Sequence, residues 1–146
     1  MFEHLKEHPE RKALAEELLR YTEDQFVNWE RQPMDITWFK DPMPSSRWVT
    51  PCAQEQLGFW MPVNGSAITF VDTYVRAYRA TGKKLYLAKA RDLANTVLVV
   101  QKMHKGEYPT FLVPPTSDGE FEQRGSLWIN CAQHVADVMI KLAGVK

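Results

Sequence analysis

The sequence lacks an excess of charge of either sign. Its 146 residues include 18 Lys and Arg and 18 Asp and Glu, so the formal net charge is zero. Without a net positive field, nucleic acid is not an expected partner. The chain also lacks a run of about eighteen apolar residues, so no membrane-spanning helix is predicted. The charged stretch 1–19 contains no apolar segment of a secretory signal, so we expect a soluble protein, cytoplasmic or, if processed, periplasmic or secreted.

Cysteine is scarce, and no metal or nucleotide motif is present. Cys52 and Cys131 are the only cysteines, and their separation matches no metal or redox spacing. Two buried thiols are the default interpretation, and a disulfide is the alternative. His4 and His8 are spaced as His-x-x-x-His but are expected to be exposed and unremarkable, and the sequence has no Cys-x-x-Cys and no glycine-rich phosphate loop. We therefore predict no metal and no cofactor.

The apolar residues recur with helical spacing over four stretches, which predicts an all-α protein. The length suits one domain, residues 1–146. The predicted helices span about 9–31, 64–81, 84–104 and 127–143. In the first, two rows form the expected apolar stripe, namely Leu14, Leu18, Tyr21 and Gln25 beside Ala15, Leu19, Thr22 and Phe26. In the last, the positions expected to face inward are Ile129, Ala132, Val135, Ala136 and Met139.

The two central helices are joined only by "TGKK", which predicts an antiparallel hairpin. Asn64 or Ser66 is a candidate N-terminal cap of the first, and Gly82 supplies its left-handed stop. Along the chain a long loop (32–64), this short turn and a second long loop (106–126) connect the four helices in that order. Because consecutive helices run in opposite directions, both long loops are expected at the same end of the helices. Within them, 52–60 is expected to hold a short helical turn, and 110–113 to pair with 120–123 as a small hairpin.

One long segment resembles a known superfamily. "MPVNGSAITFVDTYVRAYRATGKKLYLAKARDLANTVLVVQ" is similar to a hairpin of the (α/α)-toroid, or six-hairpin glycosidase-like, superfamily, and "SLWINCAQHVADVMIKLAG" resembles its next inner helix. The motif marks the hairpin repeat and occurs in hydrolases, epimerases, lyases and helical scaffolds. A complete toroid needs about twelve helices, whereas four are predicted here. The resemblance therefore implies the C-terminal portion of a larger toroid or a truncated relative, with self-association as one way to cover exposed helical faces.

The resemblance implies a carbohydrate-active protein, and glycoside hydrolysis requires two carboxyl groups that flank the scissile bond. Glu55 is the first candidate for the general acid, because Phe59 and Trp60 are near enough in sequence to desolvate it. Asp35 and Asp41 flank Trp38 and are its candidate partners. The alternative is that these carboxylates are solvated loop charges, since no spacing in the sequence identifies a pair.

Aromatic and polar residues near the loops are candidates for binding the sugar. Aromatic faces stack on pyranose rings, whereas the alternative is that these side chains pin the long loops to the helices. His134 could act as an acid or base in an epimerase-like site, although a hydrogen-bonded core histidine is the simpler interpretation. The candidate binding residues are Trp38, Trp48, Trp60, Asn64, Tyr108, Trp128 and His134.

Three functions remain open at this point. The first is a glycoside hydrolase-like protein that acts on an oligosaccharide. The second keeps the fold without catalysis, as a helical module that binds sugar or another protein. The third is a sugar epimerase-like protein, which would pair His134 with a loop carboxylate.

Overall fold

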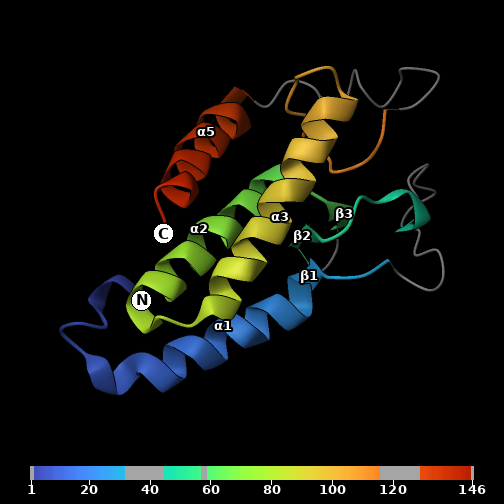
Figure 1. Ribbon diagram of the computed structural model, residues 1–146. Helices are drawn as coiled ribbons and strands as arrows, with labels where there is room; N and C mark the ends of the chain where they lie inside the picture. Colours follow the sequence, from blue (N-terminus) through green and yellow to red (C-terminus); the bar gives the residue numbers. More distant parts are fainter. Residues whose placement is uncertain (1, 32–44, 57–58, 116–128, 146) are drawn as a thin grey trace.

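The computed structural model describes residues 2–31, 45–56, 59–115 and 129–145, and α-helices dominate them (Figure 1). The helices are α1 (Lys12–Phe26), α2 (Asn64–Thr81), α3 (Lys84–Met103) and α5 (Ile129–Ala143). Three 3₁₀ turns accompany them, η1 (Phe2–His4), η2 (Pro9–Arg11) and η3 (Ser45–Arg47). The strands β1 (Val27–Asn28), β2 (Cys52–Gln56) and β3 (Phe59–Pro62) form one small sheet. The helical class that the periodicity predicted is confirmed.

Helices α2 and α3 form the predicted antiparallel hairpin. Gly82 ends α2 in the left-handed conformation (φ 72°), and its N–H donates to the Tyr78 carbonyl at 2.7 Å. A residue with a Cβ is disfavoured at this φ, so glycine permits the tight turn into α3. The two facing stripes are fully buried around Ile68, Tyr74 and Leu93. This hairpin is the centre of the hydrophobic core.

Helix α5 packs against α2 and runs in the same direction (Figure 1). Among its residues 134–143, whose burial is described, Val135 and Val138 are buried and Met139 is half-buried. Ala136, which the sequence placed inside, is exposed, and that prediction is wrong. The reason is rotation about the helix axis: with Val135 and Val138 inward, Ala136 falls on the opposite side. Both α2 and α5 begin at the end of the molecule where the strands lie (Figure 1).

Helix α1 differs from its prediction in length and in rotation. It ends at Phe26 rather than near Arg31, because Val27 is already extended (φ −103°, ψ 125°) and pairs with Ala53. The inward row is Ala15, Leu19 and Glu23. The other predicted row is largely exposed, with Leu14 at 51%, Leu18 at 44% and Tyr21 at 65%. A carboxylate therefore occupies a buried position that the sequence would assign to an apolar residue.

Residues 52–56 and 59–62 are two paired antiparallel strands, so the helical turn predicted at 52–60 is wrong for the residues that the structure describes. Strand β2 pairs antiparallel with β1 through Asn28 and Cys52, and with β3 through Gln54 and Pro62. Pairing with β1, which follows α1, fixes Cys52 and Ala53 in extended backbone at zero exposure. Long-range pairing of this kind outweighs local propensity.

The two loop regions meet at one end, as predicted. The backbone N–H of Leu112 donates to Pro62 at 2.9 Å, and the N–H of Val49 donates to Leu112 at 3.1 Å. Val63 and Phe111 form an isolated antiparallel bridge. Residues 110–113 thus pair with the start of α2, and their predicted partner, 120–123, lies outside the described residues.

Candidate functional site

The loop end of α2 brings together the backbones of two candidate residues. Glu55 lies on β2 and Trp60 on β3, between the paired positions Gln54–Pro62 and Gln56–Phe59. The hairpin therefore holds the candidate acid and one candidate sugar platform on adjacent strands. The other candidates of this group lie outside the described residues, and these are Asp35, Trp38, Asp41 and Trp128.

Two of the predicted aromatic platforms pack inward. Trp48 is 5% exposed and belongs to the hydrophobic core, while half-buried Tyr108 packs against that core. Burial of an aromatic ring contributes strongly to stability but leaves its face unavailable to a ligand. Trp48 therefore pins its loop to the helices, which is the alternative that the sequence left open for it.

Asn64 is fully buried at the first turn of α2. Its side chain makes no cap, so the predicted capping role is wrong. Instead Nδ2 donates to the Pro109 carbonyl at 3.2 Å, and the backbone N–H donates to the Thr110 carbonyl at 2.8 Å. Within the described residues Oδ1 has no hydrogen-bond partner. Asn64 thus joins the start of α2 to the second loop and keeps one acceptor in the interior.

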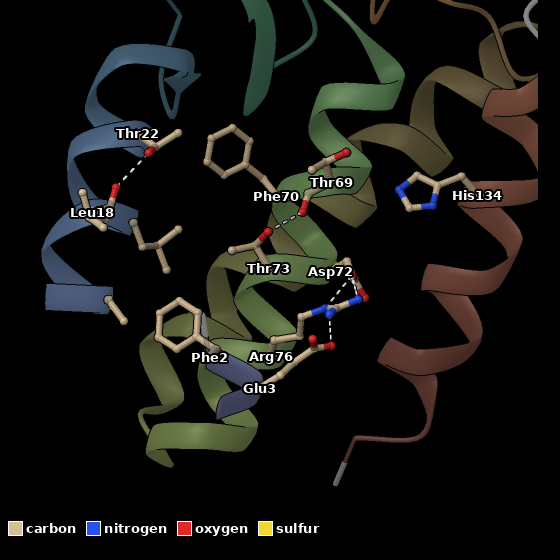
Figure 2. A pocket seen from close by; sticks show the side chains of 12 residues that line it. Phe2, Glu3, Leu18, Thr22, Thr69, Phe70, Asp72, Thr73, Arg76 and His134 are labelled. Carbon is tan, nitrogen blue, oxygen red and sulfur yellow. Dashed lines mark hydrogen bonds and ion pairs between the residues drawn. The ribbon is translucent and has the colours of Figure 1, made fainter. Parts of the chain in front are cut away.

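His134 lies elsewhere, on the α5 side of an open groove between α1 and α2 (Figure 2). It is exposed, so the interpretation as a core histidine is wrong. The groove has a volume of about 540 Å³. Its apolar lining comes from three elements, with Phe2 from η1, Leu18 from α1 and Phe70 from α2. We call this cavity the α1–α2 groove.

Three threonines line the same groove, and each satisfies its hydroxyl within its own helix. Thr22 donates to Leu18 and Thr73 donates to Thr69 (Figure 2), and Thr69 donates to Gly65, each at 2.8 Å. With the hydroxyl protons committed to backbone carbonyls, these side chains present their methyl groups to the cavity. The middle of the groove is therefore more apolar than its composition suggests.

One end of the groove carries an ion cluster. Arg76 Nε donates to Asp72 Oδ2 at 2.7 Å and Arg76 Nη1 donates to Glu3 (Figure 2), and Lys141 Nζ lies 3.1 Å from Asp72 Oδ1. Burial alone would raise the pKa of Asp72, but the hydrogen bonds from Arg76 and Lys141 prevail and lower it. Asp72 is therefore a paired anion, and it joins α2 to α5.

A second polar cluster lies between α1 and α3 and was missed from the sequence. The Glu23 carboxylate, 7% exposed, accepts a hydrogen bond from Trp29 Nε1 at 2.9 Å and another from Lys89. The Lys89 ammonium lies 5.2 Å from the Trp29 ring centroid and 5.8 Å from that of Tyr74. Burial, followed by the charge of Glu23, raises the pKa of Tyr74. The only signal in the sequence is the position of Glu23 in the row of Ala15 and Leu19.

A cavity of about 390 Å³ adjoins this cluster and holds a second carboxylate. Glu16 accepts a hydrogen bond from the Tyr86 hydroxyl at 3.1 Å and pairs with Lys83 at 2.7 Å. Glu16 and Glu23 thus each have a cation and an aromatic hydrogen-bond donor, which are Lys83 and Tyr86 for Glu16 and Lys89 and Trp29 for Glu23. Because each is partnered, the cluster acts first as a polar tie between α1 and α3.

Neither a metal site nor a membrane span emerges from the part of the chain that the structure describes. Its His, Cys, Asp and Glu side chains form no group of three that could hold a metal ion. None of its helices combines the length and the apolar character needed to cross a membrane. Cys52 is a buried free thiol, and burial raises its pKa to about 12. A thiol with so high a pKa is a poor nucleophile.

Comparison with known proteins adds no relative. No protein-family model, no curated protein and no solved structure matches this chain.

Proposed function

We propose that this chain is part of an (α/α) toroid of the six-hairpin glycosidase-like type. The supporting observation is the direction of its helices: α2 and α5 are parallel neighbours, and α3 returns antiparallel to α2 (Figure 1). In a toroid of hairpins, successive inner helices run in one direction and each outer helix returns. On this proposal α2 and α5 are inner helices and α3 is an outer helix.

The proposed function is to bind or hydrolyse an oligosaccharide at the end where α2 and α5 begin. Parallel inner helices start at a common end, and the hairpin that carries Glu55 and Trp60 lies there. Glu55 is the proposed general acid, with Asp35 or Asp41 as its partner. Trp60, Trp38 and Trp128 are the proposed platforms. Trp48, Tyr108 and Asn64 support the loops on which such a site would be built.

The test is a panel of aryl-glycosides and oligosaccharides, followed by release of reducing sugar and by calorimetric binding. Glu55→Gln should abolish turnover and leave binding, because the amide keeps the shape but cannot donate the proton. Trp60→Ala should weaken binding. Glu107→Gln is the matched control, since Glu107 is an exposed carboxylate at the same end. No turnover by the native protein, together with binding that Trp60→Ala leaves unchanged, would refute the site.

A binding module without catalysis is the second candidate. Saturable oligosaccharide binding without product release would support this candidate over hydrolysis. The epimerase alternative gains no support from the described residues, where His134 lines the α1–α2 groove together with Phe70 and Asp72 (Figure 2).

A further inference from the structure

The cavity of about 390 Å³ between α1 and the first half of α3 has the size of a ligand site, and we call it the α1–α3 cavity. The two helices are not closely packed, and long polar side chains span the gap between them. Sites of small ligands usually have volumes of about 300–1,000 Å³. The walls include Glu16, Leu19 and Glu23 from α1 and Leu85, Tyr86 and Lys89 from α3.

Glu16 and Glu23 each use only one carboxylate oxygen for the hydrogen bonds described above. Both partners of Glu16 reach its Oε1, and both partners of Glu23 likewise reach Oε1. Oε2 of each residue takes part in none of these four bonds, so it can accept a hydrogen bond from a ligand. A lysine ammonium has three donors, so Lys89 keeps donors after its bond to Glu23. An available acceptor thus lies beside a cation that can still donate.

The hydroxyl of Tyr74 is a further unused polar group beside the cavity. The Tyr74 ring is stacked on Tyr86, with the ring centroids 6.3 Å apart, and its centroid lies 5.8 Å from Lys89 Nζ. Both of these neighbours line the cavity. Tyr74 is fully buried, and within the described residues its hydroxyl has no hydrogen-bond partner. A buried hydroxyl without a partner costs free energy, which favours a ligand that offers it a hydrogen bond.

We propose that the α1–α3 cavity binds a neutral polyhydroxylated ligand, of the chemistry that a sugar presents. A hydroxyl group can donate to a carboxylate and accept from an ammonium at the same time, so it can use Glu23 and Lys89 without separating their ion pair. A ligand with a net charge finds no excess of the opposite charge. Carboxylates and cations are balanced around the cavity, and they are Glu16, Glu17 and Glu23 against Arg20, Lys83 and Lys89.

The apolar part of the walls and the spacing of the carboxylates indicate the size of the ligand. Leu19 and Leu85 line the cavity beside the ring of Tyr86, and such surfaces suit the apolar face of a sugar ring. Glu16 and Glu23 are two helical turns apart, which is about 10.5 Å along α1. One sugar ring does not extend so far, so a ligand of two rings is expected. The cavity shares no residue with the hairpin of Glu55 and Trp60, and this proposal does not rest on that site.

The first experiment is calorimetric binding of cellobiose and maltose, with 1,5-diaminopentane and glutamate as charged probes. The native protein should bind a disaccharide with a Kd below about 10 mM and bind neither charged probe. Glu16→Gln replaces one carboxylate oxygen by an amide donor and should raise the Kd about three- to tenfold. Asp92→Asn is the matched control, because Asp92 is exposed on α3 and lies outside the cavity. This control should leave the Kd unchanged.

Acetylation of lysines locates the bound sugar in the native protein, without any substitution. The disaccharide should slow acetylation of Lys89, with the half-saturation that calorimetry gives, and leave Lys84 unaffected. Lys84 is exposed on the same helix and lies outside the cavity. The proposal is overturned if neither disaccharide binds, if a charged probe binds more tightly, or if both lysines respond equally. It is also overturned if Trp60→Ala abolishes binding and Glu16→Gln does not, a result that leaves the site at the hairpin standing.

Discussion

The buried Glu23–Lys89 pair makes the sharpest prediction for stability. Lys89→Met keeps most of the side-chain volume and removes the ammonium group that neutralises Glu23. The carboxylate would retain the hydrogen bond from Trp29 at 2.9 Å but would stay buried at 7% exposure without a cation. A charge in that position must be desolvated without compensation, so the folded state is destabilised.

The expected loss of unfolding free energy depends on how deeply the Glu23–Lys89 pair is buried. Removing one partner of a fully buried ion pair costs about 3–5 kcal/mol. The Lys89 side chain is 22% exposed, so water reaches the vacated position and the expected loss is about 2–3 kcal/mol. That figure includes about 0.5–1 kcal/mol for the ammonium over the Trp29 and Tyr74 rings. For a chain of this length the melting temperature should fall by about 5–10 °C.

The assay is urea unfolding followed by tryptophan fluorescence and far-ultraviolet circular dichroism. Lys102→Met, an exposed change on the same helix, is the control and should cost less than about 0.5 kcal/mol. Glu23→Leu combined with Lys89→Met removes both charges, so the double variant should be more stable than Lys89→Met alone. A loss below about 0.5 kcal/mol for Lys89→Met, or strict additivity in the double variant, would refute the account of the pair.

Three further predictions concern a turn, a thiol and a carboxylate. Gly82→Ala should cost about 1–2 kcal/mol in urea unfolding, because φ is 72° and no neighbour of the new Cβ adds a clash. The thiol of Cys52, whose pKa burial raises to about 12, should escape labelling at about pH 8 until the chain unfolds. Its contribution to stability is present below the ordinary pKa of 9.0 and is lost as pH rises toward 12, so alkaline melts should show the loss. Since its partners lower the pKa of Asp72, stability should fall as pH drops through 3.8 and below, and Asp72→Asn should flatten that part of the pH profile.

The α2–α3 hairpin could be predicted because its signals are local. Apolar residues recur every three or four positions, and Gly82 interrupts them once, at the turn that the structure contains. The predicted start of α3 at Lys84 is confirmed, and its end falls at Met103. Helices with a regular stripe depend on neighbours within one turn, and those neighbours are visible in a sequence.

The strands could not be predicted because their partners are distant. Val27 pairs with Ala53, and residues 62–63 pair with 111–112. Neither "VN" nor "CAQEQ" has the alternation of a half-buried strand, and β1 is only two residues long. The strands cover the end of the helices, where buried backbone N–H and C=O groups require hydrogen bonds, and pairing with each other supplies these bonds.

Helix α1 explains why the candidate site was harder to predict than the fold. Its apolar rows are nearly equivalent in the sequence, and a charged residue in one row argues against burying that row. The structure buries the row of Glu23 nonetheless, because Lys89 and Trp29 reach it from outside α1. Glu55 was selected because aromatic residues follow it in the chain. Glu23 also has an aromatic environment, because the rings of Trp29 and Tyr74 lie next to its partner Lys89. Tyr74 and Lys89 are far from Glu23 in the sequence, so this environment is visible only in the structure. Carboxylates whose environment is built from several elements can therefore be found only after the fold is known.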